Sequence, residues 1–524
     1  MARSTLINRI KNRKQQNNDK ARDKAPQQVN LQVEITKDLD CNVKNSKEIF
    51  GNPDDLVIRE LMIGSIEKRS AIVYISGLTD EDLINNNILK TIQLNMKDFK
   101  TNILEDIYEE VVAITAIKKT QSMDEVSLAI LNGSTAFYID GSDTVLIMET
   151  AGGERRSIEE PDSETLVRGP RDGFVESIDT NLALIRRDIK DTNLRFKGYE
   201  IGKRTKQKLV MVYMEGIVNP EIVQEVDRRL KSIDTDYVSD SSHVEQWIED
   251  SFLSPFPQLL DTERPDRVSS NVIKGKVVIL LNGSPFALIA PITIGDALHS
   301  MEDYSQRWVS ATLLRALRYL TAFFAMFLPA LYIALVSYHP GMIPSTLTYS
   351  IAGSREGVPF PSAIEAFLMA LTFEILHEAG VRLPKVIGQT IGIVGGLVIG
   401  EAAVSAGIVS PIMVVVTALT AIASFSIPAY SVAVTFRVLR FACMIAASLL
   451  GLYGVILVYI MVNIHIVNLK SIGIPYSTPF APTFVSDWRD LVLRAPFTIL
   501  KKNPKYLKTV NNESAENDGK QGKE

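Results

Sequence analysis

The sequence predicts an α+β protein, in which a cytoplasmic region of two similar α/β subdomains is followed by an all-α polytopic membrane domain. Two observations predict this fold class. Roughly the first 310 residues are rich in charged side chains and contain only short apolar runs, whereas residues 317–466 contain long segments almost without charge. The charged part also repeats a pattern of strands, turns and helices, which is typical of a duplicated unit.

We expect residues 1–48 to form a disordered basic leader. Its first part, MARSTLINRIKNRKQQNNDKARDK, contains eight Lys and Arg residues but no apolar stretch of the kind found in signal peptides. A solvated tail and a contact with anionic lipid are both compatible with this composition.

Two short segments carry the repeat. Residues 72–84 and 211–223 each contain a β-branched and aromatic run that ends at a glycine, Gly77 or Gly216, and is followed by a candidate helix start. The second segment lies 139 residues after the first. Each therefore predicts a strand, a turn and a helix.

Two Asn-Gly pairs, at 132–133 and 282–283, follow further on and lie 150 residues apart. Because Asn-Gly favours the type I′ turn, we expect each pair to close a β-hairpin. The similar offsets of the two repeats predict one duplicated α/β unit, with subdomains at 49–150 and 151–300.

The segment that joins the subdomains is dense in both signs of charge. We interpret its arginines as a structural bridge between the subdomains, and an anion site is the alternative. The arginines concerned are Arg168, Arg171, Arg186 and Arg187.

Composition and motifs exclude several function classes. Cys41 and Cys443 are the only cysteines, one in the leader and one in an apolar segment, so we expect no internal disulfide and a reducing compartment. The formal net charge of −5 does not show the positive charge that is typical of proteins that bind nucleic acids. Residues 198–205, GYEIGKRT, lack the spacing of a phosphate loop, and Glu374 with His377 forms only one copy of a Glu-x-x-His pair. We therefore predict no metal, no cofactor and no enzyme activity.

The helical domain is expected at 301–466, followed by a tail at 467–524 whose end is disordered. Four segments are apolar enough to span a membrane, namely 317–338, 386–406, 409–430 and 441–465. Basic residues before the first span and in the tail favour the cytoplasm for both ends, whereas those between the spans conflict with any simple count of crossings. We therefore favour a helix at 362–380 that is partly inserted in the membrane or lies at its interface, because neither four nor five full crossings agree with all of the basic residues.

This helix carries charged residues on one face. At 100° per residue, Glu374, Glu378 and Arg382 lie together with His377, while Glu365 lies on the opposite side. Such a face suits an aqueous vestibule or a protein partner.

The segment at 386–406 contains a glycine every fourth residue, and this stripe allows close packing of helices. Its members are Gly388, Gly392, Gly396 and Gly400. Glu401 follows directly and is a functional candidate, because a charge is costly against lipid; a hydrated position at the end of the helix is the alternative.

Five stretches in the order found here closely resemble the A subunits of the GerA-type nutrient germinant receptors of endospore-forming bacteria. They are EEPDSETLVRGPRDGFVESIDTNLALIRRDIK (159–190), SPFPQLLDTERPDRV (254–268), EDYSQRW (302–308), SREGVPFPSAIEAFLMALTFEILHEAGVRLPK (354–385) and AAVSAGIVSPIMVVVTALTAIASFSIPAY (402–430).

The resemblance implies a multi-pass protein of the spore inner membrane with a cytoplasmic N-terminal region. It also implies an oligomeric, channel-forming subunit that passes cations when a nutrient is sensed, together with a transporter-like B subunit and a lipoprotein C subunit. In this interpretation Glu401, Glu374, Glu378 and Arg382 line or flank the ion path, and the glycine stripe packs subunit on subunit. The alternatives are the SpoVA-associated paralogue, which amplifies germination, and a scaffold that does not conduct.

Overall fold

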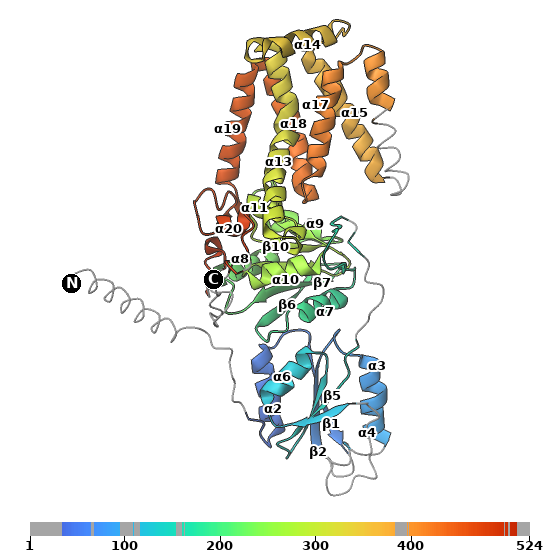
Figure 1. The fold of residues 1–524 in the computed structure, drawn as a ribbon. Helices are drawn as coiled ribbons and strands as arrows, with labels where there is room; N and C mark the ends of the chain where they lie inside the picture. Colours follow the sequence, from blue (N-terminus) through green and yellow to red (C-terminus); the bar gives the residue numbers. More distant parts are fainter. Residues whose placement is uncertain are drawn as a thin grey trace, which may run out of the picture.

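The computed structural model describes residues 34–63, 68–94, 108, 116–152, 160–161, 163–382, 396, 398–496, 498–500 and 503–510. Two α/β subdomains are stacked one on the other, and a bundle of helices stands on the second (Figure 1).

The first subdomain is built on an antiparallel sheet with the strand order β1-β2-β4-β5-β3. The strands are β1 (Leu56–Ile63), β2 (Lys68–Ile75), β3 (Ile117–Thr120), β4 (Thr135–Ile139) and β5 (Val145–Met148). The helices are α2 (Leu39–Phe50), α3 (Glu81–Leu83), η1 (Ile84–Leu89), α4 (Lys90–Leu94) and α6 (Met123–Leu131). Alternate residues of β2 point to opposite faces, so the sheet has one core with α2 and α6 and another with η1.

Helix α2 begins inside the predicted disordered leader at 1–48 and ends two residues after it. Its residues Leu39, Val43 and Phe50 are buried against the sheet, and Asp38 caps its first turn by accepting a hydrogen bond from the backbone N–H of Asp40. The described part of the leader is therefore ordered from Glu34 onward, because its apolar side chains complete one core of the first subdomain.

The second subdomain has the corresponding strand order β6-β7-β9-β10-β8, again antiparallel. Its strands are β6 (Leu194–Ile201), β7 (Gln207–Met214), β8 (Leu260–Thr262), β9 (Val277–Leu281) and β10 (Ala287–Ala290). Its helices are α7 (Ile178–Asp188), α8 (Pro220–Lys231), α9 (Ser241–Ile248), α10 (Pro265–Ile273), α11 (Ile294–Ala297) and α12 (Glu302–Ser305). The matching order is what a duplicated unit predicts.

The repeat is more regular than the Asn-Gly pairs indicate. Strand β7 begins 139 residues after β2, at 207 against 68, and β9 begins 142 residues after β4, at 277 against 135. The predicted offset of 150 is wrong because it aligns two turns that are not equivalent.

The Asn132-Gly133 pair ends helix α6 and does not form a hairpin, because the preceding apolar residues continue the helix. Its equivalent is Gly275 after α10, and both glycines have positive φ, +89° and +91°. The turn that corresponds to Asn282-Gly283 is Asp140-Gly141, and each begins a five-residue loop between two paired strands. Within Asn282-Gly283 only the glycine has positive φ, so this turn is not type I′.

A buried ion pair joins the two subdomains. Arg186 is buried, and its side chain donates from Nε to Oδ2 of Asp55 at 2.9 Å and from Nη2 to Oδ1 at 3.2 Å. Arg195 donates to the Phe50 carbonyl across the same interface. The interpretation as a structural bridge is confirmed for Arg186, whereas Arg168, Arg171 and Arg187 are exposed.

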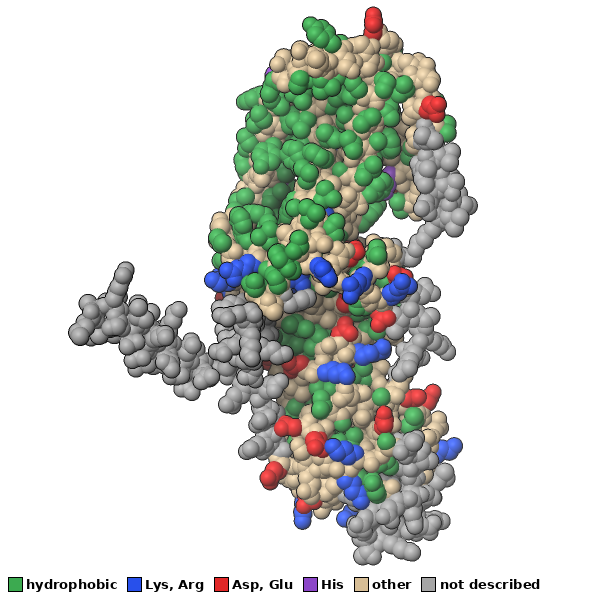
Figure 2. All heavy atoms as spheres, in the orientation of Figure 1, with side chains coloured by type: hydrophobic (Ala, Val, Ile, Leu, Met, Phe, Trp, Pro, Cys, Tyr) green, Lys and Arg blue, Asp and Glu red, His purple; other side chains and the backbone are tan. Residues whose placement is uncertain are grey.

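The helical part contains α13 (Trp308–Ser337), η3 (Pro340–Met342), α14 (Ser345–Arg355), α15 (Ser362–Arg382), α17 (Pro411–Phe425), α18 (Tyr430–Leu450) and α19 (Leu452–Asn468), and residues 398–405 are also helical. By length and composition, α13 and α18 could each cross a membrane, and α17 and α19 are shorter apolar helices. Figure 2 shows hydrophobic side chains over most of this part, with a band of Lys and Arg where it meets the second subdomain.

The predicted span at 441–465 is wrong, because two helices occupy this region. Helix α18 ends at Leu450 and α19 starts at Leu452, with Gly451 between them at φ +59° and ψ −138°. A Cβ on Gly454 would overlap the Ala446 carbonyl oxygen. The two helices therefore pack closely against each other immediately after the turn. The uniform hydrophobicity of the segment conceals this turn.

The segment after α19 returns to the second subdomain. It contains β11 (Lys470–Ser471), β12 (Ile474–Pro475), α20 (Trp488–Leu491) and η4 (Lys505–Leu507). Ile472, Leu491, Tyr506 and Leu507 are buried in the same core as β7, α8 and α9. The described chain therefore enters and leaves the helical part at the same end (Figure 1).

Candidate functional site

The N-terminal part of α13 is fixed by a buried arginine to the two α/β subdomains, which we call the soluble region. Arg315 is 0% exposed and donates from Nε to Oδ2 of Asp303 at 3.1 Å. It also donates to the carbonyl oxygens of Asp490 and Leu493. Arg318, one turn further along, donates to the same Asp303 oxygen at 2.8 Å. These contacts join three segments: α12, α13 and the segment that follows α19.

Asp490 extends this network into the second subdomain. Its carboxylate accepts hydrogen bonds from Lys274 Nζ at 2.9 Å and Tyr304 Oη at 2.8 Å. Burial opposes ionisation of this carboxyl, yet the Lys274 ammonium holds the pKa of Asp490 well below its usual range. His299 Nε2 lies 2.7 Å from the Leu491 carbonyl oxygen, and burial lowers the pKa of His299 to about 3. His299 is therefore neutral and donates to this carbonyl. We call these contacts of Asp303, Arg315 and Asp490 with their partners the joint.

In a second contact, the loop after α9 lies between α18 and α19. The Phe256 ring packs against Phe436, His465 and Tyr476, with ring centroids 6.0 to 6.2 Å apart. Ser254 Oγ lies 2.8 Å from His465 Nε2. Because these rings belong to both parts, the core of the second subdomain continues into the helical bundle.

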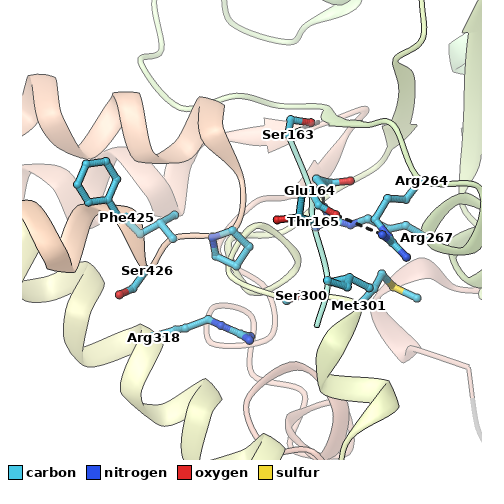
Figure 3. A pocket seen from close by; sticks show the side chains of 13 residues that line it. Ser163, Glu164, Thr165, Arg264, Arg267, Ser300, Met301, Arg318, Phe425 and Ser426 are labelled. Carbon is cyan, nitrogen blue, oxygen red and sulfur yellow. Dashed lines mark hydrogen bonds and ion pairs between the residues drawn. The ribbon is translucent and has the colours of Figure 1, made fainter. Parts of the chain in front are cut away.

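A cavity of about 290 Å³ lies at this junction, and we call it the junction cavity. Figure 3 shows Arg264 and Arg267 on one side of it and Arg318 and Ser426 on the other. Each of the three arginines is engaged: Arg264 with Asp266 at 3.0 Å, Arg267 with Glu164, and Arg318 with Asp303.

A second cavity of about 180 Å³ lies between α15, α17 and α18, and we call it the helix cavity. Its charged lining is an ion-pair cluster. Glu374 of α15 accepts from Arg437 Nη1 at 2.8 Å and from Arg440 Nη2 at 3.2 Å, and both arginines belong to α18. The remaining lining residues include His377 and Phe425, whose ring centroids are 5.3 Å apart.

The structure separates the residues that we predicted for the ion path. Glu374 faces the two arginines of α18, whereas Glu378 and Arg382 pair with each other on the exposed surface of α15. Glu401 is exposed on the helical segment at 398–405.

Two of the four stripe glycines, Gly388 and Gly392, lie outside the described residues. A Cβ at Gly396 would meet no atom within 4 Å, while one at Gly400 would lie 3.3 Å from Val414 of α17. Gly400 thus packs within the chain, and Gly396 presents an open face.

Glu365 is a buried carboxylate to which we assigned no role from the sequence. It is 0% exposed and accepts hydrogen bonds from Ser410 N at 3.0 Å and Ser410 Oγ at 2.7 Å, with Arg355 Nε at 3.3 Å. It thereby binds the N-terminus of α17 to α15. A signal was present, because a charge inside an apolar segment predicts a polar partner.

Within the described ranges, no group of three or more His, Cys, Asp or Glu side chains is placed to hold a metal ion. The candidate functional site therefore has three parts: the joint between the α/β subdomains and the helical bundle, the two cavities beside this joint, and the ion pairs between helices.

The sequence matches a known family over most of its length. The family described as Bacillus/Clostridium GerA spore germination protein matches residues 44–506. Spore germination protein GerLA of Bacillus cereus is 50% identical over 89% of this chain and 95% of its own length. Spore germination protein KA of Bacillus subtilis (strain 168) is 40% identical over 94% of this chain and 90% of its own.

A solved structure is also similar to part of the chain. The crystal structure of the N-terminal domain of the A subunit of the Bacillus megaterium spore germinant receptor GerK3 is 34% identical, covers 49% of this chain and 96% of its own, and superposes with a TM-score of 0.40. From the family match and the two relatives, this chain belongs to the GerA family of Bacillus/Clostridium spore germination proteins.

Proposed function

We propose that this chain is the A subunit of a nutrient germinant receptor in the spore inner membrane. In this proposal it crosses the membrane several times with its N-terminal region in the cytoplasm. It assembles with further copies of itself, a transporter-like B subunit and a lipoprotein C subunit, and passes cations when a nutrient is sensed. Family membership and the names of the relatives as spore germination proteins support the germination role.

The observation that carries the mechanism is the joint. Arg315 and Asp303 are both 1% exposed or less, and a charge that loses its partner in such a site is costly. A rigid connection of this kind transmits a displacement of the second subdomain directly to α13. Because the segment after α19 is part of the same joint, both ends of the bundle respond together.

The ion path is proposed along the open side of the bundle. Glu401 is its first candidate, because it is exposed on the helical segment that also carries the open face of Gly396. An assembly in which several copies turn this segment toward a common axis would bring their Glu401 carboxylates together, and a ring of carboxylates favours cations. We keep Glu378 and Arg382, which pair with each other on the exposed surface of α15, as flanking candidates. Glu374 contributes less to cation attraction because two arginines neutralise it.

The joint is tested by Arg315→Met in spores, with Arg307→Met as the matched control because Arg307 is exposed one residue before α13. The two variants remove the same charge near the same helix. We expect Arg315→Met to abolish nutrient-triggered potassium release at a normal level of the protein in the membrane, and Arg307→Met to leave release unchanged. Normal release with Arg315→Met at a normal protein level would contradict the proposed coupling.

The ion path is tested separately by Glu401→Gln, which keeps the size of the side chain and removes its charge. We expect slower potassium release with unchanged assembly of the subunits, as measured by cross-linking. Unchanged release would remove Glu401 from the path.

A further inference from the structure

The helix cavity contains more positive than negative side chains, although apolar helices surround it. Arg437 and Arg440 face a single carboxylate, Glu374. Arg440 lies ten residues after the start of α18 at Tyr430, which corresponds to about 15 Å along the helix. A charge at this depth in an apolar segment marks a functional site by default.

Arg440, which lines this cavity, has a buried hydrogen-bond donor without a partner among the described residues. The residue is 5% exposed, and its Nε–H has no partner among the described residues, while Nη2 donates to Glu374 at 3.2 Å. A buried donor without a partner is destabilising, and more so when the group is charged. An additional anion beside the guanidinium group would satisfy this donor and balance the charge.

The rest of the cavity is suited to an apolar body. Its walls include Phe373, Phe425, Pro428 and Ala433. The volume is about 180 Å³, slightly more than the cavity of about 150 Å³ that holds benzene in an engineered protein core. The size therefore limits the apolar body to one ring or a short branched chain.

We propose that the helix cavity binds a small amphiphilic carboxylate, in which one carboxylate group sits on an apolar body of this size. The ligand carboxylate accepts hydrogen bonds from Arg437 and Arg440 and competes with Glu374 for them. Binding therefore weakens the ion pairs that hold α15 against α18. This site does not depend on the proposed germination role.

The junction cavity provides a route to this site. The two cavities share Ser163, Phe425, Ile427 and Pro428 in their linings, so they adjoin. The three arginines of the junction cavity are each paired with a carboxylate, so the route has a polar lining. A carboxylate dissolved on the side of the soluble region can enter this way. A membrane fatty acid has the same head group and would enter from the lipid, but only its carboxylate and the adjoining end of its chain would fit in the cavity.

The test uses the full chain in nanodiscs of neutral phosphatidylcholine, with binding of para-fluorobenzoate followed by fluorine NMR. Para-fluorobenzamide has the same shape without the charge and serves as the ligand control. The variants are Arg440→Met, which keeps the bulk of the side chain, Glu374→Gln, which removes the competing carboxylate, and Arg489→Met, which removes an exposed charge far from the cavity.

We expect saturable binding of the benzoate and none of the benzamide. Arg440→Met should weaken binding on the order of tenfold or more, since a hydrogen bond to a charged group is lost. Glu374→Gln should tighten binding, a result that a purely structural role of the cluster does not produce, and Arg489→Met should leave it unchanged.

A competition with octanoate and laurate distinguishes the two sources of the ligand. If laurate displaces the fluorobenzoate at a lower concentration than octanoate does, the natural ligand comes from the membrane. If octanoate displaces it at the lower concentration, the natural ligand comes from the aqueous side. The proposal is overturned if the wild-type chain binds neither the benzoate nor the fatty acids, or if Arg440→Met binds as well as the wild type.

Discussion

Arg186 and Asp55 illustrate how single residues hold the soluble region together. Their side chains are 1% and 5% exposed and lie 131 positions apart in the sequence. Arg186 also stacks over the Phe196 ring, with 4.4 Å between its guanidinium carbon and the ring centroid. The pair therefore joins the two subdomains in a place that excludes water.

Replacing Arg186 by Met should destabilise the contact between the subdomains by about 3–5 kcal/mol, because Asp55 would remain buried without a partner. Thermal unfolding of the detergent-solubilised chain measures this effect. Arg187→Met, at the exposed neighbouring position, should change stability by no more than about 0.5 kcal/mol. Adding Asp55→Asn to Arg186→Met should restore part of the loss; a double variant less stable than the single one would refute the explanation.

His299 predicts a specific pH dependence of the joint. Burial lowers its pKa to about 3 in the folded chain, against about 6.5 when unfolded. The neutral form thus stabilises the fold fully above pH 6.5, and this contribution falls by about 1.4 kcal/mol for each pH unit below that value until the folded pKa is reached.

His299→Gln keeps a donor for the Leu491 carbonyl but cannot be protonated. Between pH 7 and pH 5 the wild type should therefore lose about 2 kcal/mol of stability relative to this variant. Comparing the two chains at each pH cancels the other titrating groups, such as Glu245, whose pKa burial raises to about 8. A constant difference between wild type and variant would show that His299 is not held neutral.

At the scale of elements, the turn between α18 and α19 depends on one glycine. Gly451 adopts φ +59° and ψ −138°, and a Cβ there would lie 2.9 Å from Cβ and Cγ of Tyr338. Gly451→Ala should destabilise the chain by about 1–3 kcal/mol. Gly353→Ala is the control, because Gly353 lies within α14, where an added Cβ would meet open space, and the change should be stabilising by about 0.5–1 kcal/mol. Thermal unfolding in detergent compares the two, and equal effects would contradict the strain at Gly451.

This turn also shows why part of the fold was not predictable. The strands of the repeat could be found, because β-branched runs and glycines mark them locally. The turn at Gly451 lies inside a continuous apolar run, and hydrophobicity alone gives no sign of it. Similarly, the Asn132-Gly133 pair by itself predicts a hairpin, although the helix before it decides its geometry.

The candidate site was predicted only in part, because charge pairs between helices depend on packing. The sequence identified Glu374 as a polar residue of an apolar segment, but its partners lie 63 and 66 residues further on. In the sequence, Arg315, Arg437 and Arg440 indicate only the orientation of the helices. The pairing of Arg437 and Arg440 with Glu374 changes the interpretation of this carboxylate from a residue of the ion path to one member of a cluster with net positive charge.

At the scale of the whole molecule, the soluble region lies at one end of the helical bundle and α14 at the other (Figure 1). If the bundle spans the membrane, Tyr349 on α14 and Val510 after η4 must face opposite sides; they are 79% and 64% exposed. The test uses chains in which Cys41 is replaced by Ser. Tyr349→Cys should react with an impermeant maleimide only in right-side-out vesicles. Val510→Cys should react with it only in inverted vesicles. Reaction of both from the same side would contradict a bundle that crosses the membrane.

The joint, the continuous core and the returning C-terminal segment connect the two parts of the chain, and family membership supports a role in spore germination. The most direct test is the release of potassium and dipicolinic acid from spores that lack this chain, exposed to single nutrients and, separately, to a treatment that bypasses receptors. A receptor A subunit predicts loss of response to one class of nutrient with the bypass intact. Uniformly slower release to every nutrient, or an unchanged response, would contradict it and favour the amplifying paralogue or a scaffold.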